Sequence, residues 1–503
     1  MDNQTTTTNK TPTDSSSLPT DSNQEVGYVI QSRESVVFLD GLPSVHINDM
    51  VESSNGVRGW VNALHHNKVE VLLLDDATVI PGEIFKKSPS RLGLSVGQFL
   101  LSRAINPIGV PIDGKGPLAK TKTDSLMELE QVAPGIDQRQ FITTQFDTGI
   151  TVIDSLIPLG KGQRELVMGD AHSGKTGFLI DLIINQKQTG VICIYACIGK
   201  TTTYVKNMLD ILKTNEALTN TVVIAASSSE PAPLIFLTPK TAFTVAEFFQ
   251  KQGKDVLVIL DDMGNHAKIH REISLLGNKN PGKESYPGDI FYQHAHLLER
   301  AGNFKAEHGG GSITALPVIE LNLNDFTTLI PTNLMSMTDG HLLFRLELRN
   351  QGQRPAIDVS LSVSRVGRQT QDRIQNSLSE VLRQLMSQAL EVETVSRFGT
   401  ELPYQTQLIL RRKQLLDEML KQDPLTSIPK SIQSILLSLV FTSFLAEKDK
   451  HFIDKYKNTL IDAFLNNPEF SKVTQMIPNL QNDLELINTL EAIVPKLKIL
   501  CPE

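Results

Sequence analysis

Residues 169–176 of the chain read, in order, Gly169-Asp170-Ala171-His172-Ser173-Gly174-Lys175-Thr176. This segment fits the pattern G-x-x-x-x-G-K-[S/T], whose glycines let backbone N–H groups curl around a phosphate. The apolar, strand-like residues 166–168 precede it, and the helix-like residues 177–185 follow it. With a strand before it and a helix after it, a chance glycine-rich turn is disfavoured. All eight residues are therefore expected to bind ATP or ADP.

Two residues are candidate ligands of the Mg²⁺ that accompanies such a nucleotide. The hydroxyl of Thr176 is expected to bind the ion, while Lys175 neutralises the outer phosphates. Asp261 follows the apolar run 256–260, and ligands bind at the carboxyl ends of parallel strands. An acidic turn after a strand is common by itself, but a position downstream of a phosphate loop favours a metal role. We expect Asp261 to hold Mg²⁺ through a water molecule.

Apolar runs of strand length continue after the phosphate loop and alternate with helical patterns. They occupy residues 191–197, 222–226 and 256–260. Uninterrupted apolar strands that alternate with helices are typical of a parallel sheet covered on both faces. The pattern predicts an α/β nucleotide-binding domain over residues 96–371.

The regions on either side of this domain have different patterns. Residues 26–95 contain short apolar runs separated by turn residues, which predicts a small β-barrel domain. Residues 372–503 have helical periodicity and predict a helical domain. Residues 1–25 are rich in Thr, Ser, Asn, Asp and Pro, and we expect this tail to be disordered.

Composition limits the class of protein. The chain has 503 residues, which is enough for several domains, and a formal net charge of -8, which disfavours a constitutive nucleic-acid binder. Cys193 and Cys197 lie in an apolar run and are expected to be core thiols in a reducing compartment. With no signal segment at its start, the chain is expected to be cytoplasmic, with docking onto a membrane complex left open.

Two pairs of histidines have spacings that could suit a metal. They are the adjacent His65 and His66, and His266 with His270 at helical i, i+4 spacing. Neither pair has a third ligand or the glutamate of an H-E-x-x-H motif. We therefore expect surface histidines rather than a metal site.

Further segments carry recognisable motifs, and together they resemble the alpha-subunit family of F-type ATP synthases. The resemblance covers the chain from about residue 26 to its end, and the number of motifs makes it specific. It implies an N-terminal β-barrel, a central RecA-like domain and a C-terminal helical domain, in the order that the periodicity predicts. The motifs are residues 161–166 (KGQREL), 183–186 (IINQ), 286–292 (YPGDIFY), 297–301 (LLERA), 330–333 (IPTN) and 362–367 (SVSRVG).

The resemblance also implies a division of labour between subunits. Alpha subunits alternate with catalytic beta-type subunits in a hexamer around a gamma-type central stalk, in a complex peripheral to the inner face of the membrane. Catalytic subunits have a water-activating glutamate after the strand that follows the phosphate loop, where alpha subunits typically have glutamine. Here that position is Lys200, whose ammonium group cannot accept a proton from water. Arg365 matches the arginine finger that alpha subunits extend to the neighbouring beta site.

Other positions match the family only in part. Arg354 and Pro355 resemble the segment that lines the adenine pocket, and Gln422 matches a glutamine on its far side. The second glutamine of the family falls near Pro424, which puts the purine contacts there in doubt. Ala171 and His172 replace an Arg-Gln pair within the phosphate loop, and a loop histidine without a special role is the favoured interpretation.

Two questions stay open at the level of sequence. The Thr/Ser-rich tail replaces the helix with which alpha subunits grip the peripheral stalk, so the chain belongs either to a specialised F-type-like ATPase or to a housekeeping synthase with a drifted end. The alternative function is an autonomous hexameric ATPase of the secretion-export or RNA-translocase type. Lys200 disfavours it, because such enzymes need a catalytic glutamate, and no nucleic-acid partner is expected.

Overall fold

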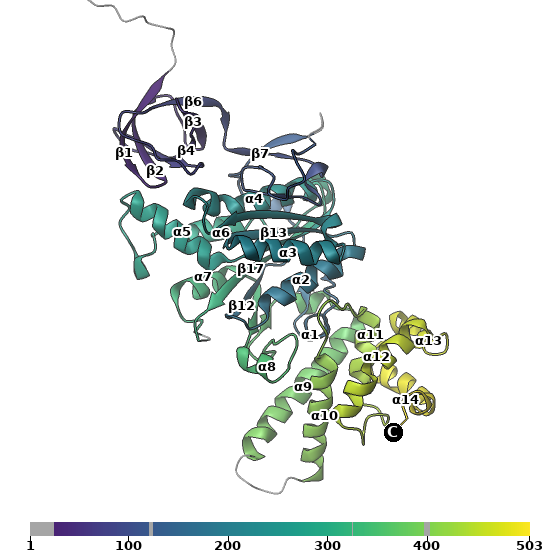
Figure 1. Cartoon of the computed structure of the whole chain (residues 1–503). Coiled ribbons are helices and arrows are strands. Elements are labelled where there is room, and N and C mark those ends of the chain that lie inside the picture. Colours follow the sequence, from purple (N-terminus) through teal and green to yellow (C-terminus); the bar gives the residue numbers. More distant parts are fainter. Residues whose placement is uncertain (1–24, 120–123, 324, 397–402, 503) are drawn as a thin grey trace, which may run out of the picture.

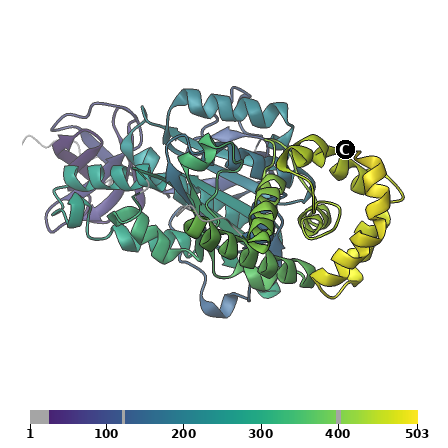
Figure 2. The same ribbon diagram turned by 90° about the horizontal axis from the view of Figure 1, so that it is seen from below.

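The computed structural model describes residues 25–119, 124–323, 325–396 and 403–502. The expected disordered tail lies outside these residues except for Glu25. Within them the chain forms a β-barrel, a central sheet covered by helices, and a group of C-terminal helices, which confirms the predicted fold class. The barrel and the C-terminal helices lie at opposite ends of the central part (Figures 1 and 2). No helix in the described ranges has the length and apolar character needed to cross a membrane.

The barrel closes because its first and last strands pair. The strand order is β1-β2-β5-β4-β3-β6, and β6 pairs with β1. Alternate residues of these strands point inward, and Val37, Val61 and Phe85 are fully buried there. The strands are β1 (Val26–Arg33), β2 (Val36–Gly41), β3 (Asp49–Ser53), β4 (Arg58–Leu64), β5 (Val69–Leu73) and β6 (Ile84–Arg91).

A short two-stranded ribbon leads from the barrel to the central sheet, in which the order is β19-β18-β12-β17-β15-β13-β14-β8. The pairs from β18 to β8 are parallel, and β19 is antiparallel. The ribbon is β7 (Gly93–Val96) with β9 (Ser125–Glu128), and the sheet contains β8 (Ala104–Ile105), β12 (Glu165–Asp170), β13 (Ile192–Lys200), β14 (Thr221–Ser227), β15 (Asp255–Asp261), β17 (Ser312–Leu321), β18 (Gly340–Phe344) and β19 (Val363–Ser364), while β16 (Gly302–Asn303) pairs with β17.

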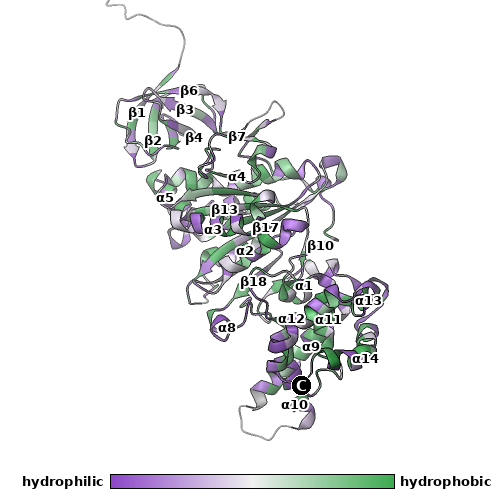
Figure 3. Cartoon of the chain, turned by 45° about the vertical axis from the view of Figure 1, so that its right-hand side comes forward, coloured by the Kyte–Doolittle hydropathy of each residue, from purple (hydrophilic) through white to green (hydrophobic). Residues whose placement is uncertain are grey.

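Both faces of the sheet are buried, as the uninterrupted apolar strands predict. Along β13, Cys193, Tyr195 and Cys197 pack into one core, whereas Ile194 and Ala196 pack into another. Successive side chains of a strand point to opposite faces, so one strand serves two cores. Figure 3 shows the apolar character of the central strands. The covering helices are α2 (Lys175–Asn185), α3 (Thr202–Thr214), α4 (Ala232–Gln250), α5 (Met263–Leu276), α6 (Ile290–Leu298), α7 (Leu329–Met337) and α8 (Leu346–Asn350).

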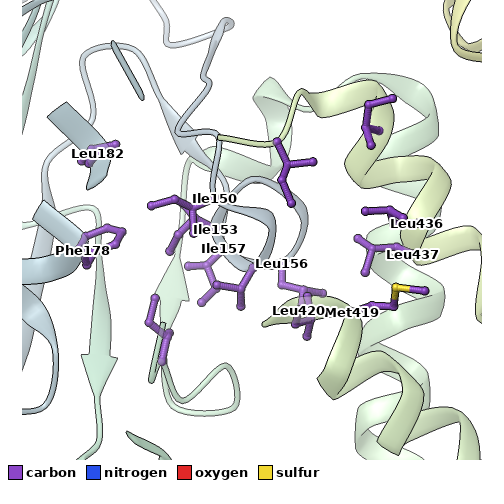
Figure 4. Packing of buried hydrophobic residues seen from close by; sticks show 14 of the residues in the cluster. Ile150, Ile153, Leu156, Ile157, Phe178, Leu182, Met419, Leu420, Leu436 and Leu437 are labelled. Carbon is purple, nitrogen blue, oxygen red and sulfur yellow. The ribbon is translucent and has the colours of Figure 1, made fainter. Parts of the chain in front are cut away.

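The C-terminal helices share a core with the central domain. Helix α1 (Thr151–Leu156) and its flanking residues lie between α2 and the C-terminal helices (Figure 4). Ile153 and Leu156 pack in the same buried cluster as Met419 and Leu436. The C-terminal helices are α9 (Arg373–Ser396), α10 (Tyr404–Leu420), α11 (Lys430–Leu439), α12 (Lys450–Asn466), α13 (Ser471–Met476) and α14 (Asp483–Leu500).

Candidate nucleotide-binding site

The phosphate loop connects the end of β12 to the first turn of α2, as the sequence pattern predicts. Gly169 has φ +155°, and a Cβ atom there would lie 2.3 Å from the carbonyl oxygen of Phe344. Gly174 has φ +106°, in the left-handed region that favours glycine. Both glycines are therefore required by the shape of the loop. The N-terminus of α2 behind them offers unpaired N–H groups and a favourable dipole to an anion.

Lys175 is the cation of this loop and is mostly buried. Its Nζ donates to the carbonyl oxygens of Gly169 and Asp170, both at 2.7 Å. Burial lowers the pKa of Lys175, and the carboxylates of Glu320 and Asp261 act in the opposite direction. The loop thus holds a buried positive charge at the mouth of a helix, an arrangement suited to phosphate.

Asp261 ends β15, and three protein groups donate to its carboxylate. Lys200 Nζ lies 2.8 Å from Oδ1. The hydroxyls of Tyr195 and Tyr204 lie 2.8 Å and 2.5 Å from Oδ2. The Tyr204 hydroxyl also lies 3.5 Å from Thr176 Oγ1, so it bridges the two residues that were expected to hold a metal.

Lys200 ends β13, the neighbouring strand to β15, and contacts a second carboxylate. Its Nζ lies 3.1 Å from Asp262 Oδ2. Burial by itself lowers the pKa of Lys200, but Asp261 and Asp262 outweigh burial and raise it above its usual value. Lys200 is therefore an ammonium ion that offers only donors. It cannot accept a proton from an attacking water molecule.

These contacts decide whether the expected Mg²⁺ fits. A carboxylate that holds the ion through water must accept hydrogen bonds from the water shell, and Mg²⁺ keeps several of its waters. Protein donors fill three of the about four acceptor positions of the Asp261 carboxylate, and the donor on Oδ1 is a cation that a hydrated Mg²⁺ would face. The residues present do not fit a hydrated Mg²⁺ at Asp261. Thr176 is exposed beside this cluster.

A cavity next to the phosphate loop contains the residues that were expected to contact a purine. It is bounded by residues of α2 on one side and by the segments 349–356 and 422–426 on the other, including Arg354, Pro355 and Gln422. The side chain of Gln422 donates to the carbonyl oxygens of Gly149 and Thr426, at 2.7 Å and 2.9 Å. Its Oε1 accepts from the backbone and the hydroxyl of Thr151. Gln422 thus fixes the cavity wall as well as lining it.

Arg365 lies at the other end of β18 from the phosphate loop of its own chain. The preceding residue, Ser364, pairs with Gly340 at the start of β18, and the Arg365 N–H donates to the Asp339 carbonyl at 2.9 Å. The loop, in contrast, leaves the sheet where Gly169 pairs with Phe344 at the end of β18. Arg365 and the loop therefore lie at opposite ends of β18. The arginine is exposed.

The expectation of surface histidines is wrong for one of the two pairs. His266 and His270 are buried on the inner face of α5, with exposed fractions of 2% and 3%. His266 stacks on Phe236 with ring centroids 5.0 Å apart and contacts His294. Helical i, i+4 spacing put both rings against the core instead of toward solvent. His65 is exposed and contacts Glu70. No group of His, Cys, Asp and Glu that could hold a metal is found among the described residues.

Several residues of the site are not predicted by the sequence. Tyr195, Tyr204 and Asp262 join Asp261 and Lys200 in one cluster, and Arg349 donates to the carbonyl of His172 in the phosphate loop. The doubled aspartate at the end of an apolar strand was the available signal. The tyrosines gave none, because their contacts depend on which strands become neighbours.

Comparison with known proteins identifies the family. Residues 149–364 match the ATP synthase alpha/beta family, nucleotide-binding domain, and residues 371–497 match the ATP synthase alpha/beta chain, C terminal domain. The ATP synthase subunit alpha of Mycoplasma pneumoniae is 39% identical over 443 residues, which cover 88% of this chain and 85% of the relative. That of Metamycoplasma arthritidis is 40% identical, covering 91% and 86%. That of Caldanaerobacter subterraneus is 41% identical, covering 84% and 83%. The chain belongs to the ATP synthase alpha-subunit family and contains its nucleotide-binding domain.

Proposed function

We propose that this chain is a non-catalytic, nucleotide-binding alpha-type subunit of a hexameric rotary ATPase of the F type or an F-type-like kind. It binds ATP or ADP at the phosphate loop and supplies Arg365 to the catalytic site of an adjacent beta-type subunit. The observation that carries the proposal is the position of Lys200. A general base must accept a proton, and an ammonium ion bound by two carboxylates cannot.

Nucleotide binding is supported by the position of the cavity, which is lined in part by residues of the phosphate loop. Ser173 and Gly174 belong to the loop and also line the cavity that Arg354, Pro355 and Gln422 bound. A triphosphate on the helix N-terminus would extend its base into this space. The Mg²⁺ expected on Thr176 and Asp261 is not part of the proposal, because the donors around Asp261 do not fit it.

We also propose partners and a location for the chain, which its family membership and the exposed Arg365 support. Arg365 is exposed at the end of β18 that is away from the chain's own phosphate loop. Its guanidinium is therefore available to another subunit. The proposed partners are beta-type catalytic subunits, which alternate with this chain, and a gamma-type central stalk. The complex would lie on the cytoplasmic side of the cell membrane as a peripheral assembly.

ATP hydrolysis by the chain alone and with its beta-type partner tests the proposal. We expect no turnover above background from the chain alone, and steady turnover from the assembled complex. In the complex, Lys175→Ala should weaken nucleotide occupancy on this chain and leave most of the turnover, because hydrolysis takes place on the partner. Substantial turnover by the isolated chain would show an autonomous ATPase and overturn the non-catalytic assignment.

A further inference from the structure

The cluster around Asp261 contains the ammonium group of Lys200 at the place where phosphate-loop nucleotide sites use a metal ion. Lys200 Nζ lies 2.8 Å from Asp261 Oδ1 and 3.1 Å from Asp262 Oδ2, so one ammonium ion contacts both carboxylates. Asp261 is 3% exposed and Asp262 is 7% exposed. A pair of buried carboxylates attracts a cation strongly, and here the chain supplies that cation itself.

The remaining coordination of Asp261 is also provided by the protein. Tyr195 and Tyr204 donate to Oδ2, which is the role that water molecules on a metal ion would have. The Tyr204 hydroxyl extends this network to Thr176 Oγ1 at 3.5 Å. The lysine ammonium lies over the Tyr204 ring, 5.4 Å from its centroid. Lysine, two tyrosines and two aspartates thus form one connected network beside the phosphate loop.

This network changes what the site requires from a ligand. In a metal-dependent nucleotide site, Mg²⁺ neutralises phosphate charge and is held by a hydroxyl and a carboxylate of the protein. Lys200 already neutralises part of the carboxylate charge, and Tyr204 already donates to Asp261. A divalent ion would have to displace the ammonium, which is covalently tethered and so has a high effective concentration at the carboxylates.

We propose that the nucleotide site of this chain binds ATP without a divalent metal ion, with Lys200 as a built-in cation in place of Mg²⁺. The inference rests on the proposed function, because it concerns the same phosphate loop. It gives the ligand class more narrowly, as a metal-free nucleoside triphosphate whose phosphates would meet the charge of Lys175, while Lys200 balances the carboxylates. Replacement of Lys200 by a neutral residue would leave both carboxylates without a cation and create a demand for the metal.

The test is calorimetric titration of the full chain with ATP, in EDTA and in excess MgCl₂. For the unaltered chain we expect dissociation constants that agree within about threefold between the two buffers. For Lys200→Gln we expect ATP to bind at least about tenfold more tightly with MgCl₂ than with EDTA, since one charge-assisted interaction corresponds to about that factor. Lys206→Gln makes the same charge change at an exposed position of α3 and should behave like the unaltered chain.

The outcomes separate the inference from the proposed function. Binding by the unaltered chain only in MgCl₂ would overturn the inference and leave nucleotide binding intact. No binding in either buffer would overturn the proposed nucleotide site itself. Equal binding of ATP by Lys200→Gln in both buffers would show that Lys200 does not replace the metal. Lys175→Ala should weaken binding in both buffers, which assigns the measured affinity to the phosphate loop.

Discussion

At the residue scale, the phosphate loop depends on a close approach between two backbone segments. Gly169 pairs with Phe344 across β12 and β18, and the space where a side chain would begin is filled by the Phe344 carbonyl, 2.3 Å away. Backbone atoms of a central strand cannot move aside as the end of a long side chain can. Gly177, two residues into α2, has no atom within 4 Å of an added Cβ. The two glycines thus differ in what a methyl group would meet.

We predict that Gly169→Ala lowers the free energy of unfolding by about 2 kcal/mol or more, because the new methyl group forces the sheet apart. Gly177→Ala is the matched control and should raise it by up to about 1 kcal/mol, because alanine is the better helix former. Urea unfolding of the two full-length variants, followed by circular dichroism, measures both. Equal stability of Gly169→Ala and the unaltered chain would contradict the described loop geometry.

At the element scale, α1 holds the central domain to the C-terminal helices through Asp154. This carboxylate accepts from the Thr148 N–H at 2.9 Å and the Thr148 hydroxyl at 2.7 Å, from the Gly149 N–H at 2.9 Å, and from Gln433 Nε2 at 2.9 Å. Gln433 lies on α11, so the contact crosses between domains. Burial raises the pKa of Asp154 to about 6, although its donors favour the charged form.

This pKa gives a pH dependence with a definite sign. The folded chain binds the proton more tightly than the unfolded chain, in which the pKa is near 3.8. The stability from Asp154 is therefore fully present below about pH 4 and is lost as the pH rises to about 6, on the order of 3 kcal/mol. We predict that Asp154→Asn removes this slope from urea-unfolding midpoints between pH 4 and 6. The exposed Asp454 provides the control Asp454→Asn, which should keep it.

The Asn side chain also sets a second expectation at the same position. Its amide is neutral, as is the protonated carboxyl that burial favours, so at pH 7, where Asp154 is ionised, Asp154→Asn should not lower the free energy of unfolding. An unchanged pH profile in Asp154→Asn would mean that this carboxylate does not titrate within the window.

Elements whose residues alternate or repeat regularly were predictable, and contacts between distant elements were not. The apolar runs at residues 222–226 and 256–260 became β14 and β15 because a strand buried on both faces needs no polar positions. The burial of His266 depended on the neighbours that α5 acquires, which local spacing does not contain. The sequence predicts that Lys200 cannot activate water. It does not predict that Lys200 pairs with Asp261 and Asp262, because that contact requires β13 and β15 to be neighbours in the sheet.

At the scale of the whole molecule, the two proposed functions of the chain lie at opposite ends of the strands of one sheet. The phosphate loop and the cavity lie at the carboxyl end of β12, beside the C-terminal helices that contribute Gln422. Arg365 lies near the amino end of β18, which is paired with the same strand. The proposed nucleotide site and the exposed guanidinium are therefore separated by the length of β18.

The turnover number of the complex assembled with the beta-type partner reports directly on hydrolysis promoted in trans by Arg365. We predict that Arg365→Ala lowers turnover by about 10³-fold or more, because the guanidinium stabilises charge on the transferred phosphoryl group. Arg368→Ala removes an exposed arginine that pairs with Glu380 at 3.2 Å and should leave turnover near that of the unaltered complex. An assembled Arg365→Ala complex that hydrolyses ATP at the unaltered rate would contradict the account.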